Sequence, residues 1–426
     1  MQELAEEYKK MDMKNALLPW VVCVAASLFF FYEFIQGNMF ASIADNMMQE
    51  FHIQADKMAY LSSVYYVSNV LFLFVAGFLL DRFSTKRIIL IAMFLCILST
   101  FFLAFSDSFS VALLCRFVTG IGSAFCFLGP IRIASRWFPP KKMALVTGVI
   151  VTIAMTGGML AQYPLTKLVI AFGWRDALIR VGWLGIAMLG MMMFWIKDNP
   201  GSSVETKSGY LGVSDTLKKA YLNLQTIRAA MYASLMNIVV AVFGAMMGSL
   251  YLMQRLGVTK EEAAVVNSML FLGAIVGGPV IGWISDKIGL RVLPMKICAL
   301  VSVAVSLLIL YLPVSLGMMG LLFFLLGFFT AAQVISYALV AESSPPAMTA
   351  SAVSIVSILT QGGYVLYQNL FSKILLEHGG MSMIDGVPTY SYADYQSAAL
   401  IIPVAIALAW YIIVKLKETH CRQTQG

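Results

Sequence analysis

Long runs of apolar residues alternate with short polar stretches along almost the whole chain. A membrane-spanning helix needs about 20 predominantly apolar residues, and most of the runs reach or approach this length. The strands of a membrane barrel would instead alternate apolar and polar positions. The pattern predicts twelve membrane-spanning helices with the approximate limits Leu17–Ile43, Lys57–Leu80, Ile88–Ser106, Phe109–Ile131, Met143–Ile170, Arg175–Ile196, Ile227–Gln254, Ala263–Ser285, Val292–Pro313, Leu316–Ala341, Met348–Leu375 and Ala398–Val414.

The composition agrees with that pattern and excludes several classes of protein. Hydrophobic residues make up 60% of the 426 residues and charged residues only 12%, which is about half the charged share of a soluble domain. This excludes a water-soluble enzyme, a disordered chain and a disulfide-stabilised scaffold. Five of the six cysteines lie inside the apolar runs without the spacing of a metal site. We therefore interpret them as small core residues and predict neither a metal nor a cofactor.

A polar stretch in the middle of the chain divides it nearly in half. It contains Pro200-Gly201 and Lys218-Lys219 and is typical of a linker. The N-terminal residues are charged and the first apolar run is too long for a signal peptide, so we expect no cleaved leader. The predicted organisation is a cytoplasmic tail at 1–16, a six-helix bundle at 17–196, a cytoplasmic linker at 197–226, a second six-helix bundle at 227–416 and a cytoplasmic tail at 417–426.

Lysines and arginines indicate the orientation in the membrane, because they are enriched on the cytoplasmic side. With both termini cytoplasmic, 21 of the 29 Lys and Arg residues fall on that side and seven on the other, while Arg116 lies inside a span. The opposite orientation would invert this bias. We therefore interpret the formal net charge of +7 as a sign of topology and predict no nucleic-acid partner.

An internal repeat relates the two halves of the sequence. The motif that begins at Gly77 and continues with Asp81-Arg82 recurs 205 residues later at Gly282, followed by Asp286-Lys287. Two further landmarks recur at nearly the same offset, since Pro139-Pro140 matches Pro345-Pro346 and Gly157-Gly158 matches Gly362-Gly363. Three landmarks that share one offset predict two homologous six-helix halves.

These motifs resemble those of the major facilitator superfamily of secondary transporters over essentially the whole length. The loop after the second span reads GFLLDRFSTKR from Gly77 to Arg87, against G-x-x-x-D-R-x-G-R-[RK] in the family, and departs from it at Ser84 and Thr85. Arg116–Gly120 resembles the family's R-x-x-x-G motif in span four. The resemblance implies an all-α membrane protein with twelve transmembrane helices in two pseudo-symmetric bundles, both termini cytoplasmic, working as a monomer by alternating access.

Alternating access requires contacts on the cytoplasmic side that form in one state and break in the other. Asp81 and Asp286 end spans two and eight, and we expect each to face a helix N-terminus of the opposite half, where the helix dipole favours an anion. Glu342 is expected to pair with Arg82 or Arg87, and Arg136 with Asp286. The alternative is that these are solvated charges that only fix the topology. The complete set of predicted gating residues is Gly77, Asp81, Arg82, Arg87, Arg136, Gly282, Asp286, Arg291 and Glu342.

Two charged residues lie well inside predicted spans, where a charge is costly and usually functional. Glu33 lies in span one and Arg116 in span four, at depths that an arginine side chain can bridge. Both spans line the central cavity in the superfamily, and its sugar/proton symporters use a comparable carboxylate–arginine pair. The resemblance implies that Glu33 binds and releases the coupling proton while Arg116 controls its protonation. Two alternatives remain open: Arg116 holds a substrate anion, or the pair is only structural.

Polar and aromatic residues of the cavity-lining spans are candidate substrate contacts. Gln361, Tyr364 and Gln368 are spaced so that they share one face of span eleven. The alternative for every candidate is a hydrogen bond that bridges two helices. The predicted substrate-binding set is Tyr32, Gln36, Tyr65, Asn69, Gln162, Asn237, Gln333, Tyr337, Gln361, Tyr364 and Gln368.

Catalytic function is not indicated. The three histidines lie in loops or tails, and the chain carries no nucleophile elbow or phosphate-binding loop. Twelve spans built from a repeat favour a carrier over a channel, and a receptor that binds without transport is an alternative. We expect protons, a small-molecule substrate and the lipid bilayer as partners, and a bacterial inner membrane as the location.

The sequence indicates the chemical class of the substrate but not its identity. A single deep arginine suits one carboxylate, and spans one and seven lack the mid-depth arginines of organophosphate antiporters. The prediction is proton-coupled uptake of a small polar or carboxylate-bearing solute, such as an amino acid, peptide, organic acid or carboxylate siderophore. The alternative is proton-driven export of a drug or metabolite, although span five lacks the G-x-x-x-G-P signature of drug exporters.

Overall fold

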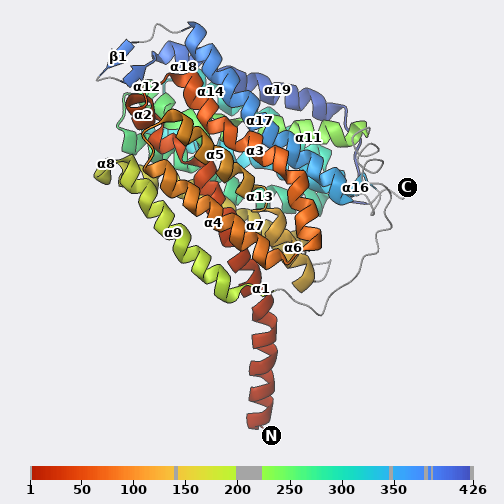
Figure 1. The fold of residues 1–426 in the computed structure, drawn as a ribbon. Helices are drawn as coiled ribbons and strands as arrows, with labels where there is room; N and C mark the ends of the chain where they lie inside the picture. Colours follow the sequence, from red (N-terminus) through yellow and green to blue (C-terminus); the bar gives the residue numbers. More distant parts are fainter. Residues whose placement is uncertain are drawn as a thin grey trace.

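The computed structural model describes residues 2–138, 143–197, 223–344, 349–378, 382–384 and 387–422, and helices account for nearly all of them (Figure 1). Most of the predicted linker lies outside the described residues. The helices of the N-terminal half are α1 (Gln2–Asn38), α2 (Phe40–Glu50), α3 (Ala55–Arg82), α4 (Thr85–Ala104), α5 (Phe109–Ser123), α6 (Leu128–Trp137), α7 (Met143–Leu160), α8 (Tyr163–Phe172) and α9 (Trp174–Trp195).

The C-terminal half begins after the linker. Its elements are α11 (Leu224–Met236), the π-helix η3 (Val240–Met247), α12 (Gly248–Leu256), α13 (Lys260–Ile288), α14 (Val292–Tyr311), α15 (Leu316–Thr330), the 3₁₀-helix η4 (Ala331–Val334), α16 (Ile335–Glu342), α17 (Thr349–His378), the strands β1 (Ser382–Ile384) and β2 (Val387–Thr389), α18 (Tyr392–Ala399) and α19 (Ile401–Val414).

Helices cover each predicted apolar segment, and ten helical stretches of the described chain are long and apolar enough to cross a membrane. The second and eleventh predicted segments are α3 and α17, whose apolar residues are interrupted by tyrosines, serines and amides. The expectation of an all-helical, multi-pass membrane protein is confirmed. The apolar pattern does not predict the small antiparallel hairpin, in which Ser382 pairs with Thr389 and Ile384 with Val387.

Several of the long apolar stretches are broken into shorter helices. The stretch at 109–137 is interrupted by a turn between α5 and α6, and the stretch at 146–172 by a turn between α7 and α8. Pro164 occupies the first turn of α8, where its missing N–H is not needed. The stretch at 224–256 changes from α- to π-helix and back. Such π-helical turns are uncommon and are frequently found at functional sites.

Each half has an apolar core of its own. In the N-terminal half the core includes Phe29 and Phe40, and it packs α1 against α9 and α4 against α5 and α9. In the C-terminal half it includes Phe243 and Phe323, and the tyrosines Tyr65 and Tyr66 from α3 also belong to it. Many large apolar side chains on the outside are exposed, Phe194 to 84%. An exposed apolar surface of this extent is typical of contact with lipid.

Close approach of two helices recurs at equivalent places in the two halves. A Cβ atom added at Gly120 in α5 would lie 2.2 Å from the Tyr65 carbonyl oxygen of α3, and one at Gly327 in α15 would lie 1.9 Å from the Leu270 carbonyl oxygen of α13. Leu270 follows Tyr65 by 205 positions, the offset of the sequence repeat. Only glycine permits these contacts, so the repeat in sequence corresponds to a repeat in packing.

The two ends of the helical assembly differ in what lies there (Figure 1). We call the end with α2, α8, α12, α18 and the β1–β2 strands the hairpin face, and the opposite end, with α6, α16 and the last described residues, the terminus face. Between them the halves pack directly, α3 against α17 and α7 against α13.

Candidate functional site

Glu33 and Arg116 are both buried between the two faces. Glu33 in α1 is 1% exposed and Arg116 in α5 is fully buried. Among the described residues no ion pair joins them. Instead, the Tyr65 hydroxyl donates a hydrogen bond to Glu33 Oε2 at 3.0 Å, and the Arg116 guanidinium lies over the Tyr65 ring, 4.6 Å from its centre. In this state the two residues do not form the direct pair that the sequence suggested, and Tyr65 contacts both of them.

Other contacts complete the surroundings of Arg116. Its Nη1 donates to the carbonyl oxygen of Gln36 at 3.1 Å, and the Phe40 ring lies on the guanidinium with its centre 4.8 Å away. Both rings supply favourable cation–π contacts. The neighbouring thiol of Cys96 donates to the carbonyl oxygen of Thr119 at 3.6 Å.

Several buried polar atoms at this place have no hydrogen-bond partner. They are Glu33 Oε1, Gln36 Nε2, Arg116 Nε and Arg116 Nη2. A buried polar group without a partner is costly, and more so when it carries a charge. In native proteins such atoms therefore require an explanation, of which a site for an absent ligand is one.

Tyrosines connect this place to the C-terminal half. The rings of Tyr65 and Tyr66 meet edge to face with their centres 4.9 Å apart, and Tyr66 packs on Tyr364 of α17 at 4.4 Å. The Tyr66 hydroxyl donates to the carbonyl oxygen of Gly37 at 2.9 Å. A row of three aromatic rings thus runs from the buried charges across the interface between the halves.

A cluster of buried amides joins the halves through the π-helix. Gln162 of the N-terminal half donates from Nε2 to the carbonyl oxygen of Gly244 at 2.9 Å and accepts at Oε1 from Asn267 Nδ2 at 2.7 Å. Asn267 also donates to Phe243 at 3.0 Å, and Gln368 donates to Ala241 at 3.0 Å. A π-helix leaves carbonyl groups out of the α-helical pattern, and in η3 three amide side chains satisfy three of them.

The other candidates do not converge on one cavity. Tyr32 points away from the interface and shares a hydrogen bond with Thr100 of α4 at 3.0 Å. Asn69 donates to Ser123 at 2.7 Å, and Asn237 donates to Gln333. Tyr337 is half-buried in α16, and Gln361 is half-buried in α17 without a described hydrogen bond. The expected shared face in α17 divides, because Tyr364 faces α3 while Gln368 faces η3.

Ion pairs and hydrogen bonds close the hairpin face. Lys260 Nζ contacts both carboxylate oxygens of Asp45, at 2.6 and 2.7 Å, although the two residues belong to different halves. Glu261 accepts from the Tyr163 hydroxyl at 3.2 Å and pairs with Lys167 at 3.1 Å.

The segment around the β-hairpin joins the same closure. The backbone N–H of Ala55 donates to the Tyr390 hydroxyl at 3.3 Å, and burial raises the pKa of that phenol, so it stays neutral at the start of α3. Together with the contacts of Lys260 and Glu261, this shows that residues of opposite halves meet across the hairpin face. The sequence analysis did not find these residues.

The terminus face carries a different arrangement, centred on Arg291. Arg291 Nη2 pairs with Glu342 at 2.7 Å and Nη1 with Asp286 at 2.5 Å. Burial alone would lower the pKa of Arg291, but the hydrogen bonds to the two carboxylates raise it overall. Glu418 accepts from the backbone N–H groups of Arg291 and Val292, at 2.7 and 2.8 Å, and so satisfies the first turn of α14.

These contacts differ from the gating pairs expected for one of the states. The described ion pair of Glu342 is with Arg291 of the same half, and the carboxylate of Asp286 is likewise held by Arg291. The pairs expected with Arg82 or Arg87 and with Arg136 stay predictions. The side chains of Asp81 and Arg82 lie outside the described residues. A side chain at Gly77 or Gly282 would meet nothing within 4 Å, so these two glycines have no packing role in this state. The functional roles of the gating set, with Arg136 in α6, stay predictions.

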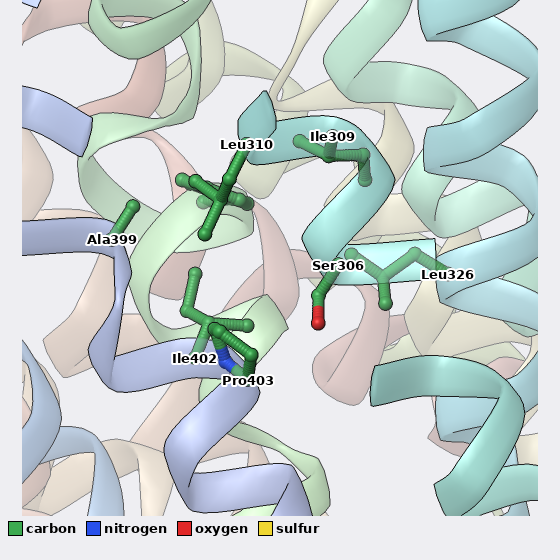
Figure 2. A pocket seen from close by; sticks show the side chains of 8 residues that line it. Ser306, Ile309, Leu310, Leu326, Ala399, Ile402 and Pro403 are labelled. Carbon is green, nitrogen blue, oxygen red and sulfur yellow. The ribbon is translucent and has the colours of Figure 1, made fainter. Parts of the chain in front are cut away.

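One small apolar crevice opens on the side of the C-terminal half (Figure 2). Its walls come from α14, α15, α18, α19 and η3, and Ser306 is its one polar side chain among residues such as Phe243, Leu326 and Ile402. It leaves no room for a water molecule. It shares no residue with the predicted sites and is not a candidate for them.

The comparisons with known proteins agree with this architecture. The profile of the Major Facilitator Superfamily matches residues 24–242 and again 229–423, so the chain belongs to this superfamily. The two matches correspond to the two halves, and they confirm the resemblance in the motifs.

Individual relatives cover only part of the chain. The probable sulfoacetate transporter SauU of Cupriavidus necator is 22% identical over 173 residues, which is 41% of this chain and 40% of that protein. The probable galactarate/D-glucarate transporter GarP of Escherichia coli is 27% identical over 169 residues, 37% of each chain. The chain thus spans about two fifths of the length of these relatives. The solved structure of a D-xylose-proton symporter matches the fold with a TM-score of 0.74 and 12% identity, over 95% of this chain and 99% of that one.

Proposed function

We propose that the protein is a proton-coupled secondary transporter that takes up a small carboxylate-bearing solute by alternating access. In this proposal twelve spans cross a bacterial inner membrane, the terminus face is cytoplasmic and Glu33 carries the coupling proton. Membership of the superfamily supports transport, and the distribution of Lys and Arg supports the orientation. The contacts across the hairpin face then correspond to a state that is closed to the outside.

The observation that carries proton coupling is the environment of Glu33. Its carboxyl group is buried, one oxygen accepts a hydrogen bond from Tyr65 and the other accepts none among the described residues. No described ion pair joins it to Arg116. The titratable or charged groups around it are Tyr65, Cys96 and Arg116. A buried carboxyl without an ion pair favours its neutral form, so a rearrangement that brought Arg116 closer would release a proton.

The relatives narrow the substrate class. SauU and GarP are named for small acids, sulfoacetate and the sugar diacids galactarate and D-glucarate. A single buried arginine fits a solute with an acid group. We therefore favour a small organic acid of this kind over the amino acids, peptides and siderophores that the sequence alone left open.

Transport by purified protein in proteoliposomes tests the coupling. We expect an acidic exterior to drive accumulation of radiolabelled D-glucarate by the wild type, by up to about tenfold for each proton and pH unit. Glu33→Gln keeps the acceptor for Tyr65 but cannot titrate, so it should retain counterflow and lose accumulation.

Glu377→Gln is the matched control, because this exposed carboxylate lies on the hairpin face and pairs only loosely with Lys373 at 3.7 Å. It should behave as the wild type. Full pH-driven accumulation by Glu33→Gln would contradict the proposed role of Glu33.

A further inference from the structure

We propose that Arg116 binds the carboxylate of the transported solute through one edge of its guanidinium group, and that Tyr65 keeps this edge free of Glu33. The inference rests on the proposed function, since it assigns the acid group of that substrate to a particular residue. The sequence left three roles open for Arg116, and the contacts of its individual nitrogen atoms favour this one.

The first step is the hydrogen bonding of the three guanidinium nitrogens of Arg116. Nη1 is occupied by the carbonyl oxygen of Gln36, whereas Nε and Nη2 have no partner. The N–H groups of Nε and Nη2 point in the same direction along one edge of the planar group. Two parallel donors of this kind match the two oxygens of a carboxylate. The arginine is therefore anchored at one nitrogen, while its bidentate edge is buried and has no partner; we call this the open edge.

The second step is the environment of the open edge. Arg116 is fully buried, its faces are covered by Phe40 and Tyr65, and the described residues place no anion against it. Aromatic rings compensate the lost hydration of a cation only in part. A carboxylate that binds there would satisfy both free N–H groups and neutralise the charge, which is the condition under which buried ion pairs become favourable.

The third step explains why Glu33 does not already fill the edge. Glu33 Oε2 accepts from the Tyr65 hydroxyl, and the Tyr65 ring lies against the guanidinium. The same side chain therefore holds the carboxyl and covers one face of the guanidinium, and no described ion pair joins Glu33 to Arg116. Tyr65 is fixed in turn by Tyr66, whose ring meets it edge to face and whose hydroxyl is bound to Gly37. Tyr65 is thus a positioning residue that separates the proton site from the anion site.

Charge balance connects the two sites. With Glu33 protonated, Arg116 is left with a positive charge that one substrate carboxylate neutralises. With Glu33 ionised and the substrate gone, the buried pair is neutral again. Neutral states are far less costly in the membrane interior than charged ones. Proton and carboxylate are therefore expected to enter together, one proton for each carboxylate bound at Arg116.

Calorimetric binding to the purified wild-type protein, with a graded ligand series, tests the anion site apart from transport. D-Glucarate, D-gluconate and D-glucitol share a six-carbon polyol chain and carry two, one and no carboxylates. One bidentate edge binds one carboxylate, so the diacid and the monoacid should bind within about twofold to fourfold of each other. D-Glucitol should bind about 10- to 100-fold more weakly, the usual effect of losing a charge-assisted contact.

Two variants locate the effect. Arg116→Lys keeps the charge but loses the two-donor edge, so it should weaken binding of the acids about tenfold or more without affecting D-glucitol. Tyr65→Phe keeps the ring on the guanidinium but releases Glu33 from its hydrogen bond. Glu33 can then compete for the edge, so acid binding should weaken about threefold or more while D-glucitol binding stays unchanged. If Arg116→Lys does not fold, Arg116→Gln takes its place in the same comparison.

The outcomes separate the two proposals. If the wild type binds neither D-glucarate nor D-gluconate better than D-glucitol, nor sulfoacetate at all, the substrate class of the proposed function is contradicted. If the wild type prefers the acids and Arg116→Lys binds them equally well, the acid site lies elsewhere and this inference alone is overturned. Acid binding weakened in both Arg116→Lys and Tyr65→Phe, with D-glucitol binding unchanged, is the result that supports it. Acid binding that Tyr65→Phe leaves unchanged would overturn the role given to Tyr65.

Discussion

At the hairpin face, two described ion pairs run from one half of the protein to the other, Lys260–Asp45 and Lys167–Glu261, beside others that stay within one half. The described ion pairs of the terminus face join only residues of the same half. Lys260 pairs with Asp45, which lies 215 positions away in the sequence and in the other half. Arg291 pairs with Asp286 and Glu342, which belong to its own half. The first arrangement has to break whenever the halves separate. The second can persist through such a movement, because it moves as one body.

The difference teaches where each kind of polar contact is useful. Cross-half contacts determine the balance between states, so single changes there should alter which conformation is populated. Contacts within one half support its rigidity, so changes there should alter stability with little effect on the balance. The three predictions below test this distinction, from the largest expected effect to the smallest.

Loss of the Arg291 side chain should have the largest effect on stability. Arg291→Met leaves three carboxylates, Asp286, Glu342 and Glu418, around a neutral side chain, and removing one partner of a buried pair typically costs about 3–5 kcal/mol. We expect a marked fall in the thermal unfolding temperature of the detergent-purified protein. Arg87→Gln, at an exposed arginine, is the control and should cost less than about 0.5 kcal/mol. Equal losses in the two variants would argue against a stabilising role for the Arg291 cluster.

Loss of the Gln162 amide should shift the conformational balance. Gln162→Leu removes two hydrogen bonds between the halves and leaves the Gly244 carbonyl group without this partner, at a cost of about 1–3 kcal/mol to the closed hairpin face. The separation of the halves can be measured by pulsed electron–electron double resonance. The spin labels are attached to cysteines introduced at the exposed positions Gln54 and Glu377, and Cys421 is replaced by serine.

A population with a longer distance between the labels is expected for Gln162→Leu. Gln361→Leu is the matched control, because that amide makes no described hydrogen bond. If the distance distribution of Gln162→Leu equals that of the wild type, the amide cluster does not hold the hairpin face closed.

Loss of the Lys260–Asp45 pair should have the smallest effect. The side chains are 14% and 23% exposed, and pairs with access to solvent contribute up to about 1 kcal/mol. Lys260→Asp should lengthen the same label distance slightly, and the swap with Asp45→Lys should restore it. The difference in label distance between Lys260→Asp and the wild type should also become smaller in high salt, because salt screens accessible charges. If the double variant with Asp45→Lys does not restore the label distance, Lys260→Asp acts through lost packing and not through lost charge.

The sequence predicted the helices well because membrane spans depend on the length of apolar runs, which a single chain displays directly. The repeat could also be predicted, and the packing of Gly120 on Tyr65 and of Gly327 on Leu270 gives it a physical cause. The hairpin at 382–389 could not be predicted, because its strands are three residues long and lie in a polar loop.

The sequence predicted which charged residues lie in the candidate site, but it did not predict which residues they contact. Burial of Glu33 and Arg116 follows from their depth in apolar segments, yet their contacts to Tyr65 depend on how α3 is rotated against α1 and α5. Tyr32 is hydrogen-bonded to a neighbouring helix of its own half, which is the alternative that the sequence left open for every polar candidate. Pairs such as Lys260 and Asp45 escape sequence reasoning because they depend on how the two bundles dock.

The stretch from α11 to α12 has a consequence for how the protein is assembled. In its most apolar window 89% of the residues are buried inside the protein, against 39–56% in the other candidate spans. The ribosome completes this stretch before α13, α15 and α17, the helices that later enclose it. It is apolar enough to rest in lipid during that interval, with a mean hydropathy of 1.9. At first its neighbours are lipid tails. Protein side chains replace them as synthesis proceeds, so the environment of this stretch changes from lipid to protein during biogenesis.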